Sequence, residues 1–521
     1  MSGTGLNGPT NYINKYLNDF MKHFRVLLIN PPNSVPIKSN FVINVFQPLG
    51  LAYVASSLEK HKYSVEIFDA LALGFDQEKI IASRKVIGAD YQTIKNKIID
   101  YRPDLVGIAT PFSFQSFESH QIAKIVKKIN PKIITLAGGT HATIQPDEML
   151  NDKNFDYLIR GEGEYATVEL LKALEKKTSL KNISSLSYRN KQNKIIHNPR
   201  SLPIQKLDAL PFPARHLLPM DKYLQAAKKG RVVEGMLAFG HKRTSIFTSR
   251  GCPFNCTFCS VHLTMTRMWR GRSPENVLKE IKECVYKYGI KYFDILDDNF
   301  TLDPKRAKKI CRLIIKEKLN IQWSTPNGIR ADRVDETLIK LMKKAGCIQV
   351  KVAPESGSPL VLKNIIKKHL DLDMVKKTVS LCKKHHLSVE AFFVVGFPEE
   401  TIDDIYKTIS FAKELRRLGC DYCYFFIATP YYGTEMYADA VKKGYLDESR
   451  YHLNKIITTT NKSLLKSPNY THKKLFELLK VAAKVNPPIT KIRLKSGLKM
   501  LILDPKRILT YSFGYLRNFL P

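Results

Sequence analysis

The hydrophobic pattern near the start of the chain alternates between short apolar runs and longer amphipathic stretches. The apolar runs predict buried strands at residues 25–30, 65–70, 104–110, 132–139 and 156–160. Helical spacing predicts helices at about 48–58 and 117–128. Because strands and helices alternate, residues 24–174 are expected to form an open, doubly wound, Rossmann-like α/β sheet. Such sheets bind ligands beyond the carboxyl ends of their strands.

A second series of strands and helices is predicted between about residues 242 and 440. The strands are expected at 244–249, 292–297, 321–327, 347–353, 389–395 and 422–428, with helices between them. This repetition predicts a parallel βα architecture. In a parallel barrel, the chemistry lies at the carboxyl ends of the strands.

Two further segments differ from these domains in composition. Residues 175–241 are basic and contain Pro203, Pro211, Pro213 and Pro219, which predicts an extended linker. Residues 441–521 are predicted to be helical and basic. Between 489 and 520, cationic residues mix with apolar and aromatic ones. This pattern fits an interfacial helix on anionic lipid or, as the preferred alternative, a helix that covers the barrel.

The composition indicates a globular protein of several domains, since 44% of its 521 residues are hydrophobic and 25% are charged. Nine cysteines in this length indicate a reducing compartment and not a disulfide framework. Residues 1–24 lack the apolar core of a signal peptide, and no apolar run is long enough to span a membrane. We therefore expect a cytoplasmic protein.

The formal net charge of +35 has two interpretations. It can attract an anionic partner, such as an acidic substrate, nucleic acid or lipid headgroups at the inner face of a membrane. It can also reflect a lysine bias of the whole proteome, because the lysines are spread along the chain. No nucleic-acid-binding module is visible, so nucleic acid is the least favoured partner.

The candidate chemistry is concentrated in Cys252, Cys256 and Cys259, which follow the first strand of the second series. Thiolates suit iron–sulfur clusters or zinc. A four-iron cluster held by three thiolates leaves one iron open for a further ligand. The alternative is a zinc site completed by a distant ligand such as His262. The Cys420-x-x-Cys423 pair is not expected to hold a second cluster, because residues three apart on a strand face opposite sides.

This cysteine spacing, with Phe258 before the last cysteine, resembles the signature of the radical S-adenosylmethionine (SAM) enzymes. The resemblance implies a partial (β/α)6 barrel in which the three cysteines hold a 4Fe-4S cluster. The open iron would bind SAM, whose reductive cleavage releases a 5′-deoxyadenosyl radical. An electron donor such as flavodoxin or ferredoxin is then required.

The same resemblance implies roles for residues at later strand ends. Asp297 or Asp298 would hold the amine of SAM. Glu355 and Ser356 would contact its ribose or carboxylate, although Ala353 stands where the family usually has glycine. Gly396, in a Gly-Phe-Pro turn, would pack against the adenine, and Phe258 would lie beside the cofactor.

Loops at the predicted strand ends of the first domain resemble those of the cobalamin-binding domain in cobalamin-dependent radical SAM proteins. The resemblance assigns a set of corrin-contacting residues, namely Thr110, Ser113, Gly138, Gly139, His141, Thr143 and Glu162. The Asp-x-His-x-x-Gly motif that supplies a lower axial histidine is missing. His141 is therefore either a neighbour of the corrin or a histidine that bonds a nearby loop carbonyl. A dinucleotide site is disfavoured, because no Gly-x-Gly-x-x-Gly follows the first strand.

Together these resemblances imply an enzyme that methylates an unactivated carbon. A methyl group would pass from SAM to cobalamin and then to a substrate carbon activated by the 5′-deoxyadenosyl radical. The basic C-terminal region favours a lipid or isoprenoid among small-molecule substrates. The alternatives are a cobalamin-dependent radical cyclase or rearrangement enzyme, and a sensor that carries cobalamin or a cluster without catalysis.

Overall fold

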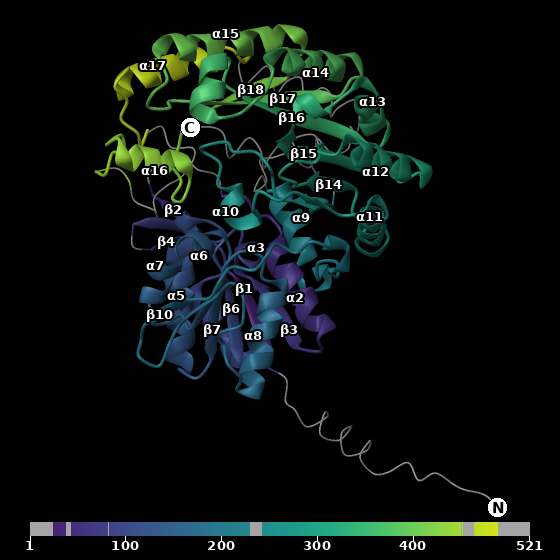
Figure 1. Cartoon of the computed structure of the whole chain (residues 1–521). Helices are drawn as coiled ribbons and strands as arrows, with labels where there is room; N and C mark the ends of the chain where they lie inside the picture. Colours follow the sequence, from purple (N-terminus) through teal and green to yellow (C-terminus); the bar gives the residue numbers. More distant parts are fainter. Residues whose placement is uncertain are drawn as a thin grey trace, which may run out of the picture.

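The computed structural model describes residues 24–37, 43–81, 83–229, 242–449, 451 and 463–487. Two α/β bodies lie one against the other, with the earlier part of the chain in one and the later part in the other (Figure 1). Within the described residues, no helix is both long enough and apolar enough to cross a bilayer. The predicted basic segment at 489–520 lies outside the described residues.

The first body is built on a seven-stranded sheet with the order β10-β9-β8-β7-β6-β1-β3. Its strands are β1 (Arg25–Asn30), β3 (Ser64–Asp69), β6 (Leu105–Ala109), β7 (Ile134–Gly138), β8 (Tyr157–Ile159), β9 (Leu186–Arg189) and β10 (Ile195–His197). The first five are parallel to one another, whereas β9 pairs antiparallel with both β8 and β10. The predicted doubly wound sheet is confirmed.

Both faces of this sheet are buried, which explains the continuous apolar runs in its sequence. Val26 and Leu28 of β1 pack into one core with helices α2 (Leu49–Lys60) and α8 (Glu164–Lys176). Leu27 and Ile29 face the other core, with α4 (Tyr91–Tyr101) and α5 (Ser116–Ile129).

Smaller elements complete this body. They are β2 (Asn33–Pro36), β4 (Glu78–Ile81), β5 (Arg84–Ile87), α3 (Ala70–Leu73), α6 (Thr140–Ile144), α7 (Pro146–Asn151) and α9 (Met220–Lys228). The predicted linker is not extended throughout, because β9 and β10 join the sheet and α9 is helical. These strands have only four and three residues, so their hydrophobic pattern is weak.

The second body is a six-stranded sheet, β11-β14-β15-β16-β17-β18, parallel throughout and in chain order. The strands are β11 (Arg243–Ile246), β14 (Tyr292–Ile295), β15 (Gln322–Ile329), β16 (Cys347–Glu355), β17 (Ser388–Val395) and β18 (Tyr422–Ile427). Because β11 and β18 are edges, the sheet is an incomplete barrel, as predicted.

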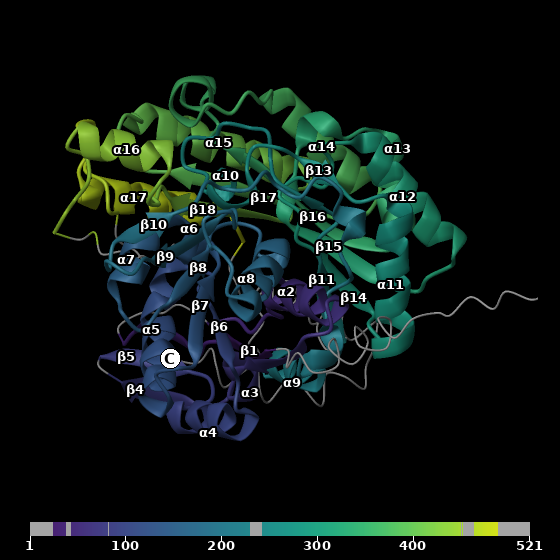
Figure 2. The same ribbon diagram turned by 60° about the horizontal axis from the view of Figure 1, so that its bottom comes forward.

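Helices cover the outer face of this sheet (Figures 1 and 2). They are α11 (Pro274–Tyr288), α12 (Pro304–Lys316), α13 (Glu336–Lys344), α14 (Leu372–Lys384) and α15 (Ile402–Leu418). α17 (His472–Ala483), in the C-terminal region, buries Leu475 and Leu478 against Ile405 and Ile409 of α15. It ends before residue 489 and leaves both interpretations of the 489–520 segment as predictions. α16 (Glu435–Lys442) lies before α17 in the chain.

The carboxyl ends of the two sheets meet. α6, which follows β7, contacts α10 (Val261–Met265), which follows the cysteine motif (Figure 1). Figure 2 shows the same two helices side by side from another direction. The edges that ligands occupy in parallel sheets therefore face one another.

Candidate active site at the facing sheet edges

The cysteine loop begins directly after a short two-stranded ladder. β12 (Ser249–Arg250) pairs with β13 (Arg270–Gly271), so both ends of the loop are fixed. Gly251 follows at φ +83°, where a Cβ atom would lie 2.3 Å from the carbonyl oxygen of Met268. Only glycine fits this backbone without a shift, and it directs the chain into Cys252.

The three cysteines are free and half-buried. Burial raises the pKa of each thiol, that of Cys259 to about 11, and each of Cys256 and Cys259 also feels the charge of Cys252. The thiols are thus near neighbours. In the described part of the chain no three His, Cys, Asp or Glu side chains converge tightly enough to enclose a single ion. Three thiols on one loop suit a cluster whose sulfurs and irons fill the space between them.

Backbone hydrogen bonds hold the middle of the loop to distant parts of the barrel. The amide of Thr257 donates to Ile366 O (3.0 Å), and its hydroxyl donates to Ile365 O (2.8 Å). Met436 N donates to Thr257 O at 3.0 Å. Phe258 packs on Phe397, with ring centroids 6.2 Å apart. This contact places Phe258 next to the turn predicted to receive adenine.

The two adjacent acids after β14 have different surroundings. Asp297 is 2% exposed and accepts from the amide of Thr248 (2.6 Å) and the hydroxyls of Thr248 and Ser249. Asp298 accepts from the Gly251 amide at 2.9 Å, and burial, followed by repulsion from Asp297, raises its pKa to about 6. Asp297 is fully engaged by protein donors, whereas Asp298 is a half-buried carboxylate that a cation would stabilise.

Glu355 at the end of β16 is held in a left-handed conformation, with φ of 67°. Its carboxylate accepts from Lys368 Nζ at 2.8 Å, and Lys368 also donates to Ala353 O at 2.6 Å. Strain at a non-glycine residue is often found where a side chain must face a ligand. Electrostatic influence of Glu355 and Lys368 on the Cys256 thiol places both near the cysteine loop.

Ser356 does not share this arrangement. Its side chain is 0% exposed, and its hydroxyl lies 2.9 Å from that of Thr408 on α15. Its hydroxyl also accepts from the Ser358 amide at 3.1 Å. The predicted contact of this side chain with SAM is therefore not supported, because its polar atom is used within the protein.

Gly396 opens the turn after β17 at φ +92°. Its amide donates to Glu400 at 2.7 Å, and burial raises the pKa of Glu400 to about 8. A Cβ atom on Gly396 would lie 3.0 Å from Leu475 of α17. The hydrogen bond to Glu400 and the packing against α17 therefore fix the shape of the turn.

On the first sheet, the ends of β6 and β7 form a close backbone contact. The amide of Thr110 donates to Gly138 O at 2.7 Å, and the Ala142 amide donates to the Thr110 hydroxyl at 3.2 Å. A Cβ atom on Gly139, at φ +124°, would lie 2.7 Å from Thr110 O. The backbone here is tightly packed and presents little side-chain bulk, which suits a broad, flat ligand.

His141 is buried and hydrogen-bonded within the protein. Its ring is 1% exposed, with Nδ1 3.1 Å from Ser113 Oγ and Nε2 2.9 Å from Glu148. Both ring nitrogens are therefore hydrogen-bonded. This arrangement corresponds to the prediction of a histidine that bonds a nearby loop, except that the partners are the side chains of Ser113 and Glu148 and not a carbonyl. The hydroxyl of Thr143 likewise lies inside, donating to Gly139 O (2.7 Å) and accepting from the Gly161 amide (2.8 Å).

Glu162 also differs from its predicted role. One carboxylate oxygen bonds Arg250 at 2.7 Å, and the other bonds Arg270 at 2.7 Å and accepts from the Ile204 amide at 2.8 Å. Its side chain is 6% exposed. The carboxylate therefore joins the two bodies through protein partners on both of its oxygens. Sequence analysis missed both arginines, although they flank the cysteine loop.

Cys420 and Cys423 lie closer together than the predicted strand geometry implied. Cys420 precedes β18, so the two side chains are not on opposite strand faces. Their sulfurs lie 3.9 Å apart and both residues are buried in the barrel core.

Two family models match the chain. The radical SAM superfamily model matches residues 246–412, and the B12-binding domain model matches residues 42–171. These ranges correspond to the second and the first body.

Two curated relatives and a solved structure extend this match. An uncharacterized methyltransferase of Pyrococcus horikoshii is 37% identical over 89% of this chain and 92% of its own. Cytidylyl-2-hydroxyethylphosphonate methyltransferase of Streptomyces wedmorensis is 30% identical over 83% of this chain and 85% of its own. The radical SAM methyltransferase TsrM of Kitasatospora setae, solved with cobalamin and a [4Fe-4S] cluster, has a TM-score of 0.66 at 16% identity, with 89% of both chains covered.

Fold and site thus define a radical SAM enzyme with an added B12-binding domain. The chain belongs to the cobalamin-dependent radical SAM methyltransferases, and its cofactors are a 4Fe-4S cluster, SAM and cobalamin. The zinc alternative is thereby set aside.

Proposed function

We propose that this enzyme methylates an unactivated carbon in a small-molecule substrate with an extended apolar part, such as a lipid or isoprenoid. The observation that supports this class is a group of aromatic side chains on the inner face of the barrel. We call Phe392, Tyr424 and Phe426 the aromatic face.

The aromatic face lies on the edge strand β18 and its neighbour β17. Phe392 is paired with Tyr424 across β17 and β18, and the ring centroid of Phe392 lies 5.6 Å from those of Tyr424 and Phe426. Its chain neighbours Ala391 and Phe393 point the other way, into the core under the helices. The three aromatic residues are only half-buried, so they offer apolar surface without belonging to that core.

A cation stands beside this surface. Lys351 Nζ lies 4.9 Å from the Phe392 ring centroid and 5.5 Å from that of Tyr424. Its nearest carboxylate, Glu390, is 3.7 Å away, and burial raises the pKa of Glu390. An apolar surface next to a loosely paired ammonium suits an apolar substrate that also carries an anionic group.

Within this proposal, Cys252, Cys256 and Cys259 hold the cluster, and Asp298 and Glu355 hold the amino acid and ribose parts of SAM. When bound, the cluster and cobalamin supply radical generation from SAM and methyl transfer, respectively. The protein orients these groups, and the turn at Gly396 bounds the adenine. A flavodoxin or ferredoxin in the cytoplasm supplies the electron, and the net charge of +35 supports peripheral contact with an anionic membrane.

The test is to incubate reduced holoenzyme and SAM carrying a labelled methyl group with lipid extract or with the water-soluble metabolite fraction. We expect label in a lipid product, and its loss by at least tenfold in Phe392→Ala with iron and cobalamin content unchanged. Label only in a water-soluble product would overturn the substrate class. A new ring without added label would favour the cyclase alternative, and no 5′-deoxyadenosine at all would favour the sensor.

A further inference from the structure

Arg250 connects the cysteine loop directly to the cobalamin-binding body. It is the last residue of β12, two positions before Cys252. Its guanidinium bonds Glu162 and Glu164, each at 2.7 Å. Both carboxylates belong to the loop and helix start after β8, at the edge that faces the barrel. One planar side chain thus spans two carboxylates, a geometry that a lysine cannot reproduce.

A second arginine closes the arrangement from the other end of the cysteine loop. Arg270 of β13 bonds Glu162 at 2.7 Å and also donates to Ile204 O at 2.9 Å and Met265 O at 3.1 Å. The four charged side chains are between 3% and 7% exposed. Two positive and two negative charges balance, so burial leaves none of them uncompensated. We call Arg250, Arg270, Glu162 and Glu164 the interdomain cluster.

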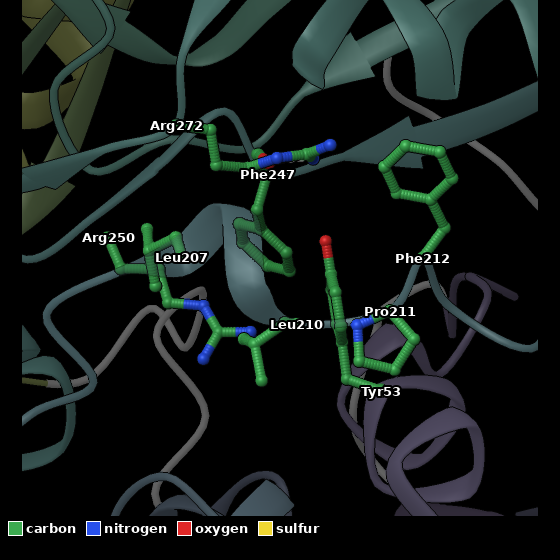
Figure 3. A pocket seen from close by; sticks show the side chains of 8 residues that line it. All are labelled: Tyr53, Leu207, Leu210, Pro211, Phe212, Phe247, Arg250 and Arg272. Carbon is green, nitrogen blue, oxygen red and sulfur yellow. Dashed lines mark hydrogen bonds between the residues drawn. The ribbon is translucent and has the colours of Figure 1, made fainter. Parts of the chain in front are cut away.

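The side chains around the interdomain cluster are closely packed, so the two bodies have little room to shift against each other. The Arg250 guanidinium lies 4.9 Å from the ring centroid of Tyr53 on α2. Figure 3 shows both side chains around a cavity that is also lined by Leu207, Leu210, Pro211, Phe212, Phe247 and Arg272. This cavity measures about 10 Å³, which is no more than one water molecule requires. The two bodies are thus packed tightly against each other here, without a layer of water between them.

We propose that the interdomain cluster is a positioning device, which fixes the cysteine loop relative to the corrin-binding edge. Hydrogen abstraction and methyl delivery must act on the same substrate carbon, although their cofactors are carried by different bodies. Since Arg250 and Arg270 bracket the cysteine loop and share Glu162, a displacement of one body moves the other body's cofactor site. This inference rests on the proposed methyl transfer, but the geometry it predicts is measurable without a substrate.

Variants of the interdomain cluster should keep both cofactors, but radical formation should become uncoupled from methylation of the substrate. A misplacement of about 1 Å between reacting groups can lower a rate about 100-fold. In Glu164→Gln and in Arg250→Lys, we expect iron, cobalamin and 5′-deoxyadenosine formation within about twofold of the unchanged protein. The yield of methylated product per 5′-deoxyadenosine should fall at least about tenfold.

The matched control is Glu280→Gln. Glu280 is also buried between two arginines, Arg215 at 2.7 Å and Arg272, but these three residues join the linker to the barrel helix α11. It should lower stability without changing the product yield per 5′-deoxyadenosine. A loss of coupling equal to that of Glu164→Gln would show a general effect of buried charge and would overturn the proposal.

A second readout separates this inference from the proposed function. Pulsed EPR of the holoenzyme measures the dipolar coupling between cobalt(II) and the reduced cluster, with no substrate present. We expect a broader or shifted distance distribution in Glu164→Gln and Arg250→Lys but not in Glu280→Gln. If the distance distribution is unchanged in both Glu164→Gln and Arg250→Lys, the positioning role is refuted even if methylation is confirmed. A changed distribution would support it even if the lipid substrate proves wrong. If Glu164→Gln fails to fold, Arg250→Lys, which keeps the charge, decides the question alone.

Discussion

Replacing Asp297 with asparagine should release the start of the cysteine loop. The carboxylate accepts from the Thr248 amide at 2.6 Å and from two hydroxyls, and among the acidic groups around buried Arg306 it has the largest stabilising effect on that charge. An amide retains only one acceptor atom and no charge. Losing charge-assisted bonds and leaving Arg306 poorly compensated should lower the free energy of unfolding by about 3 kcal/mol.

The control for this change is Asp303→Asn. Asp303 caps α12 by accepting from the Arg306 amide at 3.0 Å, and asparagine caps a helix about equally well. Both variants remove one carboxylate from the same loop, but only Asp297→Asn disturbs the segment before the cysteines.

The assay is thermal unfolding, combined with iron content after anaerobic reconstitution. We expect Asp297→Asn to unfold at a temperature several degrees lower and to retain less than half of the iron, whereas Asp303→Asn behaves as the unchanged protein. Equal melting and equal iron content in the two variants would refute the view that Asp297 shapes the loop.

Three further predictions concern backbone fit and pH. Gly251→Ala should prevent cluster assembly, because its Cβ atom would lie 2.3 Å from Met268 O; iron analysis checks this. Gly139→Ala, with a Cβ atom 2.7 Å from Thr110 O, should reduce cobalamin retention measured by absorbance while iron stays unchanged. Burial raises the pKa of Glu400 from 4.5 to about 8, so the folded state binds the extra proton and stability falls as the pH rises between these values. Glu400→Gln should flatten that decline in melting temperature, and a parallel decline would contradict the argument.

The architecture could be predicted from sequence because its signals are local. Leu27 and Leu28 face opposite cores, which produces the continuous apolar run that indicates a strand in a parallel sheet. The cysteine motif is equally local. β9 escaped prediction because its sequence, Leu-Ser-Tyr-Arg, alternates weakly and pairs antiparallel at the sheet edge.

The hydrogen-bond partners of Glu162 and His141 could not be predicted from the sequence, because tertiary packing determines them. Glu162 and Arg250 lie 88 positions apart, so neither revealed that the carboxylate was already paired. His141 looked available because its partner Glu148 is a surface-type residue whose direction no pattern encodes. In both cases, the sequence shows that the residue is polar, but the partner of its side chain depends on tertiary packing.

The most direct measurement of the central claim is cofactor stoichiometry with turnover in one sample. Anaerobic reconstitution should give about four irons per chain, the number in a cubane cluster, together with one bound cobalamin. On reduction with SAM, this sample should release 5′-deoxyadenosine, and Cys256→Ala should lose the iron and the product together. Retention of the cluster in Cys256→Ala, or a single zinc ion in the unchanged protein, would contradict the account.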